Sequence, residues 1–367
     1  MNPHLLSKNH LRDIPKTVHG GQAWRLGDVE DYSHNLNPFG PPEDIKDIID
    51  SSIQGIDHYP DDDCAELKGV ISKKFGVSKE GIIIGSGSSD IIRMFPNTFI
   101  DRGEKAVISV PSFAEYSQQC RVAGCEVVWN PLPAKDGFRI DYDSLVKRSK
   151  GAKAVYICNP NNPTGMIERR KDILSFVDHC ASEGIMVFLD ETLLELVPDY
   201  KDITCSGYAE KYPNLVVACS LTKSFAIPGI RIGFGFANPA LIDEMNKVRM
   251  TWNVGTMEQN VAKVLIGERM GHVEKAAELM SSESKWMHSQ LESIGFPVVD
   301  SDSYFYFNPV DGLGMDAKGF VDRMLKNRIM VRNCSSFGPD FASYVRFCVK
   351  DRARNERFVA AVEDSMR

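Results

Sequence analysis

The feature that most constrains the fold of this chain is a regular alternation of short apolar, β-branched runs with longer amphipathic segments. Seven such runs follow one another between residues 81 and 236, namely GIIIG, KAVISV, CEVVWN, AKAVYIC, GIMVFLD, NLVVACS and IRIGFGF. The segments between them, for example 171–183, carry apolar residues at the three-to-four-residue spacing of helices that cover a sheet. This alternation predicts an α/β fold with a mostly parallel central sheet flanked by helices.

The pattern changes after Asn253 and predicts a second, smaller unit. A long helical stretch, roughly 257–294, is followed by strand candidates at 303–308 and 344–350 and by a final helix. The first residues of the chain are rich in Pro, Gly, His and Asn, which is typical of an ordered arm. We therefore predict an N-terminal arm that contributes to the small domain and the active-site mouth, a large domain, and a small C-terminal α+β domain, at residues 1–45, 46–255 and 256–367.

Composition narrows the classes of function. The net charge is −7 and no cluster of Lys and Arg stands out, which argues against a nucleic-acid partner. No run approaches the roughly 20 apolar residues of a membrane span, and the N-terminus lacks the apolar core of a signal peptide. The nine cysteines have no CxxC or metal-ligand spacing, so they indicate reduced core residues and no metal site. We expect a cytoplasmic protein that acts on a small molecule.

The segment Ser220–Phe234, SLTKSFAIPGIRIGF, carries the most informative lysine. A lysine after Ser-x-Thr is commonly a solvated surface charge. Here the hydroxyls of Ser220 and Thr222 can bind a phosphate, and Arg231 lies eight residues further on. A lysine held among such groups would have a lowered pKa and a nucleophilic amine, so Lys223 is the candidate nucleophile.

Three other predicted strand ends carry polar groups. In FLDE, Asp190 is either the N-cap of the next segment or a carboxylate that pairs with a protonated ring nitrogen. In NPNNPTG, residues 159–165, Asn162 either belongs to a structural turn or donates its amide to a ligand oxygen. In GSGSSD, residues 85–90, a strand-to-helix turn offers backbone N–H groups to a phosphate. Together with Lys223, these patterns predict an anion site, an amide, a carboxylate and an amine on successive strand ends.

In this order and spacing, NPNNPTG, the strand-end Asp190 and SLTKSFAIPGIRIG resemble the fold-type I pyridoxal-phosphate (PLP) enzymes of the histidinol-phosphate aminotransferase group, over nearly the whole chain. Within that group the chain is similar to the L-threonine O-3-phosphate decarboxylases of cobalamin biosynthesis, through HGG (19–21), YSHNLNPFG, HYPDDD, VPSFAEY, VRNCSSF, YVRF and NER. The resemblance implies the fold of the aspartate-aminotransferase-like transferases, PLP as the cofactor, and a homodimer with shared active sites.

The resemblance also implies a role for each matching residue. Lys223 would hold the cofactor covalently, Asp190 would pair with the pyridine nitrogen, and Asn162 would bond the phenolic oxygen. Phe113 would stack on the ring. The cofactor phosphate would be held by Gly87, Ser88, Ser89, Ser220, Thr222 and Arg231, together with Tyr59 of the partner subunit. The substrate would be held by His19, Gly20, Asn35, Asn162, Arg332 and Arg346.

The two arginines can be read in two ways. An arginine on a C-terminal strand is commonly part of a surface ion pair. Arg332 and Arg346 lie on adjacent strand candidates of a small domain, which favours capture of an anionic substrate. We expect them, with His19 and Asn35, mainly at the phosphate end of the substrate.

One position departs from the aminotransferases of this group. Their segment after the strand-end aspartate reads Asp-Glu-Ala-Tyr, and the tyrosine bonds the phenolic oxygen of PLP, whereas this chain has Thr192 and Leu193. The decarboxylases are similar in carrying an apolar residue there. We therefore expect decarboxylation of L-threonine O-3-phosphate to an aminopropanol phosphate. The alternatives are histidinol-phosphate aminotransferase, with 2-oxoglutarate and glutamate, and a non-catalytic PLP-fold binding module.

Overall fold

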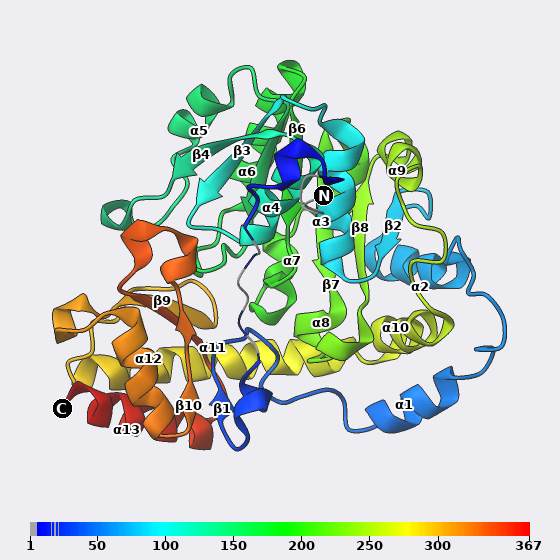
Figure 1. Ribbon diagram of the computed structural model, residues 1–367. Helices are drawn as coiled ribbons and strands as arrows, with labels where there is room; N and C mark the ends of the chain where they lie inside the picture. The colour runs from blue at the N-terminus through cyan, green and yellow to red at the C-terminus, as the bar shows by residue number, and fades with distance from the viewer. Residues whose placement is uncertain (1–5, 16, 18–19, 21) are drawn as a thin grey trace.

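The computed structural model describes residues 6–15, 17, 20 and 22–367, and its centre is a seven-stranded sheet (Figure 1). Each of the seven apolar runs forms one strand, and the strands are β2 (Ile82–Gly85), β3 (Lys105–Val110), β4 (Glu126–Pro131), β5 (Ala154–Cys158), β6 (Met186–Asp190), β7 (Leu215–Ser220) and β8 (Gly233–Ala237). Their order is β2-β8-β7-β6-β5-β3-β4. Only β8 runs antiparallel to its neighbours, so the predicted mostly parallel sheet is confirmed.

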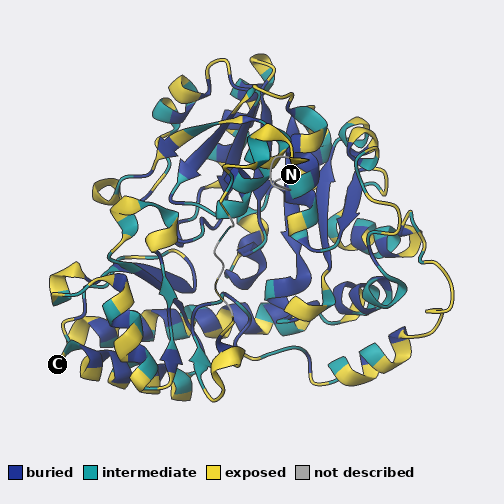
Figure 2. Cartoon of the chain, viewed as in Figure 1, coloured by how far each residue is buried: buried dark blue, intermediate teal, exposed yellow. Residues whose placement is uncertain are grey.

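Helices bury both faces of this sheet, which explains why its strands are apolar runs. Strands β5, β6 and β7 are buried at every residue. Alternate residues enter two separate apolar cores, as Ile83 and Ile84 do in β2. The covering helices are α2 (Ala65–Phe75), α3 (Ser88–Phe99), α4 (Ala114–Ala123), α5 (Tyr142–Ser149), α6 (Arg170–Ser182) and α9 (Pro239–Asn246). In Figure 2 the sheet is dark blue between helices whose outer sides are exposed.

The single helix expected at about 257–294 is wrong in one respect, because the structure has two helices there. These are α10 (Thr256–Glu268) and α11 (Met270–Ser293), separated at Arg269. The Arg269 side chain donates from Nε and Nη2 to Asp44 Oδ2, at 3.0 and 2.7 Å. This contact, 225 residues away in sequence, fixes the chain where the helix axis breaks.

The C-terminal part contains a three-stranded antiparallel sheet with the order β11-β12-β9. The two strand candidates are confirmed as β9 (Phe305–Pro309) and β12 (Tyr344–Cys348). The remaining elements are β11 (Arg332–Asn333), α12 (Ala317–Lys326) and α13 (Arg352–Met366). In the pairing of β11 with β12, Arg332 lies directly across from Arg346.

The segment around β1 lies against the C-terminal part (Figure 1), whereas His10, nearer the N-terminus, contacts the Val122 carbonyl of α4. Strand β1 (Glu30–Asp31) pairs in parallel with β10 (Ile329–Met330), and α1 (Ile45–Ser52) leads toward the large sheet. The division into an arm and two domains at residues 45 and 255 stays a prediction.

All nine cysteines are buried and free, as the sequence predicted. Among the described residues, no helix is long and apolar enough to cross a membrane.

Candidate active site

A cavity of about 260 Å³ lies at the carboxyl ends of β5, β6 and β7, next to the short C-terminal sheet. The parallel strands deliver their C-terminal residues to one edge, which is where open α/β sheets bind ligands. Its walls contain most of the predicted cofactor residues: Ser88, Ser89, Phe113, Asn162, Asp190, Ser220, Thr222, Lys223 and Arg231. They also contain five predicted substrate residues: Gly20, Asn35, Arg332 and Arg346, together with Asn162, which was predicted for both roles. The sequence-predicted residues are therefore largely brought together.

Lys223 lies on α8 (Leu221–Ser224), a single turn that follows β7 directly. Ser220 caps this turn, because its Oγ accepts a hydrogen bond from the Thr222 N–H at 3.2 Å. Burial, followed by the charges of Arg346 and Arg231, lowers the pKa of Lys223 to about 8. A fraction of neutral amine is thus present near neutral pH, as covalent attachment of a carbonyl cofactor requires.

Asn37 fastens this turn and was not predicted. Its backbone N–H donates to the Lys223 carbonyl at 2.9 Å, and its Nδ2 donates to the Ser224 carbonyl at 2.9 Å. The Lys223 carbonyl also accepts the Ala226 N–H at 3.3 Å, so Asn37 adds a second bond at the end of this short helix. The only sequence signal was its place in YSHNLNPFG, a stretch that has no periodicity of its own.

Asp190 ends β6 and is buried among hydrogen-bond donors. Its Oδ2 accepts from the Tyr116 hydroxyl at 2.7 Å, and its Oδ1 accepts from the Thr192 N–H at 2.9 Å and from the Thr192 hydroxyl. Burial raises the pKa of Asp190, an effect that a protonated ring nitrogen beside it would oppose. Tyr116 was missed by the sequence analysis. The sequence feature that could have revealed Tyr116 is its position three residues after Phe113. Both residues lie at the start of α4.

The predicted phosphate site is the turn between β2 and α3. Gly87 caps α3 with a φ of 77°, and a Cβ at this position would collide with Nη2 of Arg231. The same nitrogen of Arg231 donates to the Ser89 hydroxyl at 3.2 Å. Ser88 and Ser89 form the first turn of α3, whose N–H groups have no helical partners and suit an anion. Gly87 itself is not among the residues that line the cavity.

Arg346 joins the two ends of the site. Its guanidinium donates from Nη1 to Asn162 Oδ1 and from Nη2 to the Ser33 carbonyl. The Asn162 oxygen accepts this bond from Arg346, so its amide nitrogen is the group left to bind a ligand. That nitrogen is a donor, as a bond to a phenolic oxygen requires. The Nε of Arg346 is buried without a partner, and Arg346 has no ion pair among the described residues. A buried guanidinium in this state suits an anionic ligand.

The mouth of the cavity contains the remaining substrate candidates. Arg332 donates from Nη2 to the Ser336 hydroxyl at 2.9 Å, and a Cβ at Gly20 would lie 3.3 Å from its Cδ. The buried Asn35 leaves its Oδ1 without a partner in the wall. His34 also lines the cavity and was not predicted. His19 lies outside the described residues.

Tyr59 does not reach the cavity of its own subunit. Its ring is 77% exposed and stacks on Trp252, with ring centroids 4.1 Å apart. Its role in the site of a partner subunit stays a prediction. Within one chain, the arrangement fits PLP, because an amine, a buried carboxylate, an amide and an anion site surround one cavity.

Comparison with known proteins supports the same conclusion. The family model for aminotransferase class I and II matches residues 28–362. The chain is 30% identical to a histidinol-phosphate aminotransferase from Moorella thermoacetica, over 92% of this chain and 85% of that protein. It is also 30% identical to a protein from Caldanaerobacter subterraneus that is provisionally named threonine-phosphate decarboxylase, over 92% of each chain.

A solved structure has the same fold. It is the histidinol-phosphate aminotransferase from Clostridium acetobutylicum, with a TM-score of 0.85 and 28% identity, and the match covers 92% of this chain and 99% of that one. The predicted fold-type I architecture is thereby confirmed. The chain belongs to the aminotransferase class I and II family of PLP-dependent enzymes.

Proposed function

We propose that this protein decarboxylates L-threonine O-3-phosphate, and Leu193 is the observation that carries the proposal. Leu193 lies in the cavity wall three residues after Asp190 and is buried. The aminotransferases that the chain resembles have a tyrosine hydroxyl at this position. An apolar side chain there removes one donor to the phenolic oxygen, and the decarboxylases of the group share this trait.

The residues of the chain have separate tasks in this reaction. Bound PLP supplies the electron sink that makes cleavage of a bond at the substrate Cα possible. Asp190 would hold the proton on the ring nitrogen, and Asn162 would fix the orientation of the ring. Lys223, in its protonated ammonium form, would return a proton to Cα after carbon dioxide leaves. The protein selects the carboxylate as the leaving group by holding the substrate phosphate elsewhere.

We assign that phosphate to the arginine pair. Arg332 and Arg346 are cross-strand neighbours, and both face the cavity, so a dianionic group can take charge-assisted bonds from the two. Replacing Arg332 by Ala should lower kcat/KM for threonine phosphate about 10- to 100-fold more than for free threonine, the usual range for bonds to a charged group. Equal losses on both substrates would instead assign the arginine to the carboxylate.

One observation favours histidinol-phosphate aminotransferase as a second candidate. Arg346 donates to Asn162, the residue that we propose bonds the ring oxygen, so this arginine would lie beside the ring rather than at the mouth. An arginine in that position can hold the substrate carboxylate near the ring plane, which leaves the Cα–H bond to break. The relative from Moorella thermoacetica carries that name.

Two incubations separate the candidates. Protein with PLP and L-threonine O-3-phosphate, and no 2-oxo acid, should release carbon dioxide and an aminopropanol phosphate in equal amounts. Protein with histidinol phosphate should convert it only slowly, even with 2-oxoglutarate as the acceptor. Brisk transamination without carbon dioxide release would overturn the decarboxylase proposal and leave the fold and the cofactor unchanged.

We further propose that the protein works in the cytoplasm as a homodimer with shared sites. Exposed apolar side chains lie on the α1–α2 connection and on the segment before α10, where Tyr59 and Trp252 stack. Side chains of this kind, gathered on adjoining segments, are typical of a protein interface. In such a dimer, Tyr59 of the partner subunit would complete the phosphate site.

A further inference from the structure

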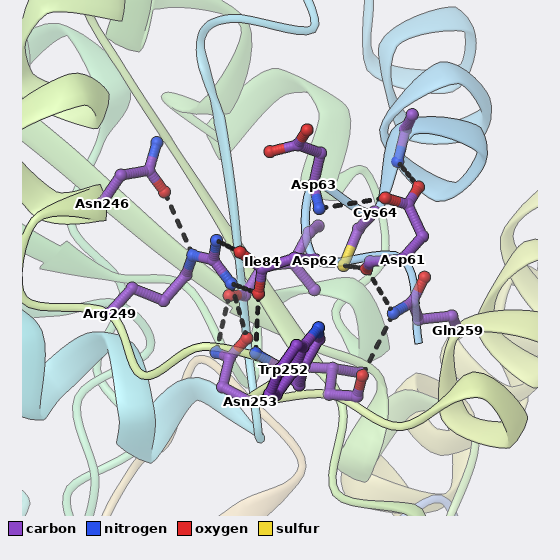
Figure 3. Close-up of polar contacts among 12 residues, drawn as sticks. Asp61, Asp62, Asp63, Cys64, Ile84, Asn246, Arg249, Trp252, Asn253 and Gln259 are labelled. Carbon is purple, nitrogen blue, oxygen red and sulfur yellow. Dashed lines mark hydrogen bonds and ion pairs between the residues drawn. The ribbon is translucent and has the colours of Figure 1, made fainter. Parts of the chain in front are cut away.

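A partly buried ion pair links two connecting segments near the predicted phosphate site (Figure 3). Asp62 lies between α1 and α2, and Arg249 lies between α9 and α10. The guanidinium donates from Nη1 to Asp62 Oδ1 at 3.1 Å and from Nη2 to Asp62 Oδ2 at 3.0 Å. The Arg249 side chain is 11% exposed, and its hydrogen bonding to Asp62 lowers the pKa of that carboxyl group. This bidentate pair is of the kind that fixes geometry as well as charge.

One end of this pair leads to Tyr59. Asp62 Oδ1 accepts the Trp252 N–H at 2.6 Å, and Trp252 holds a φ of 54°, which is uncommon for a large side chain. The Trp252 ring stacks on the ring of Tyr59, and Tyr59 precedes Asp62 by only three residues in the chain. The carboxylate therefore holds both the backbone that carries Tyr59 and the ring that supports it.

The other end leads to the phosphate site of the same subunit. Arg249 Nη1 also donates to Asn253 Oδ1 at 3.1 Å, and Asn253 Nδ2 donates to Asp90 Oδ2 at 2.8 Å and to the Ile84 carbonyl at 3.1 Å. Asp90 lies in the first turn of α3 and accepts the Ser86 N–H at 3.3 Å. These bonds fix both sides of the turn that presents Gly87, Ser88 and Ser89.

We propose that Asp62, Arg249 and Asn253 form a hydrogen-bonded network, called the relay below, that positions groups binding the phosphates of two cofactor molecules. In its own subunit the relay fixes the N-terminus of α3, and through Tyr59 it fixes a ligand of the partner's site. The proposal rests on the proposed dimer with shared sites. It does not depend on which reaction the enzyme catalyses, because only phosphate binding is at issue.

The chain offers a matched pair of variants for the first test. Asp62→Asn removes the charge from a carboxylate that is 37% exposed, and Asp44→Asn does the same at a 39% exposed carboxylate that binds Arg269. Gln259 still ties the two segments in the first variant, since its Nε2 donates to the Asp61 and Val254 carbonyls. Affinities of the cofactor-free protein for PLP and for pyridoxal, which lacks the phosphate, are measured for each.

Asp62→Asn should weaken PLP binding about tenfold, the loss of one bond to a charged group, and change pyridoxal binding less than about twofold. Asp44→Asn should change neither. Equal weakening of PLP and pyridoxal would show a general structural role and overturn the relay. An Asp62→Asn variant that behaves like Asp44→Asn would overturn it as well.

Heterodimers separate the two ends of the relay. One subunit carries Lys223→Ala, so that borohydride can fix the cofactor in one site only, to the remaining Lys223. With Asp62→Asn in the lysine-bearing subunit, the test addresses the α3 turn, and with Asp62→Asn in the other subunit it addresses Tyr59. In both arrangements, half-maximal labelling should need a higher PLP concentration than in the matching Asp44→Asn heterodimer. If either arrangement needs the same PLP concentration as its Asp44→Asn control, the two-ended relay is overturned.

A Tyr59→Phe homodimer distinguishes failure of the relay from failure of the shared site. If Tyr59 binds the partner's phosphate, this variant should also lose affinity for PLP and not for pyridoxal. Full PLP affinity in Tyr59→Phe would remove the shared site and the trans half of the relay, whatever Asp62→Asn does.

Discussion

At the residue scale, the charge on Lys223 gives a stability prediction for the cofactor-free protein. The pKa of this lysine is about 8 in the folded chain and near 10.5 when unperturbed. Between these values the unfolded chain binds more protons, so the free energy of unfolding should rise with pH across this window, by up to about 3 kcal/mol. Below pH 8 both states are protonated and the full cost of burial is present.

Lys223→Met should remove this rise and make the cofactor-free protein more stable at neutral pH. Urea denaturation at several pH values between 7 and 10.5 measures the effect. Lys135→Met, at an exposed lysine, should keep the wild-type slope. A wild-type protein whose stability stays flat across the window would contradict the buried, charged state of Lys223.

Asp190 gives a second prediction at this scale. Asp190→Asn should still attach PLP through Lys223, as judged by the visible absorbance of the bound cofactor. Turnover should fall about 100-fold or more, the effect of removing one preorganised electrostatic partner, because an amide does not hold the ring proton. Thr192→Val, which removes one donor and keeps the carboxylate, should cost less than about tenfold. Near-normal turnover in Asp190→Asn would rule out the pairing with the ring nitrogen.

At the element scale, the turn after β6 determines which hydroxyls face the ring. Leu193→Tyr restores a hydroxyl at the position where the related aminotransferases have one. This variant should move a larger share of turnovers toward proton transfer to the cofactor, seen as a several-fold faster accumulation of pyridoxamine phosphate. Leu193→Phe is the matched control, because it adds the ring without the hydroxyl. Equal accumulation in both variants would show that bulk, and not the hydroxyl, governs the outcome.

At the scale of the whole molecule, the exposed apolar residues predict the assembly. Ile56→Asp, on the α1–α2 connection, places a charge among these side chains and should convert the dimer to monomers in sedimentation experiments. Activity should fall with dimer content, because Tyr59 would no longer reach the other site. Leu279→Asp, at an exposed leucine of α11, should remain dimeric. A wild-type protein that is monomeric at micromolar concentration would contradict the shared site.

The sequence by itself determined the sheet and the core of the site. Seven apolar runs became seven strands, and the residues that follow β5, β6 and β7 met at one edge, because parallel strands bring their carboxyl ends together. Lys223, Asp190 and Asn162 could be predicted for this reason, since each lies at or just beyond a strand end. The break of the long C-terminal helix at Arg269 was not predicted, and the contact that Arg269 makes there with Asp44 joins residues 225 apart in sequence.

Only the tertiary structure decided which distant residues complete the site. Tyr116 and Asp190 are 74 residues apart, Arg346 and Asn162 are 184 apart, and Asp62 and Arg249 are 187 apart. Spacing patterns report which face of an element a residue occupies, whereas a hydrogen bond between remote segments depends on how the elements pack. The sequence therefore identified groups that line the cavity, and packing decided which side chains hold those groups in place.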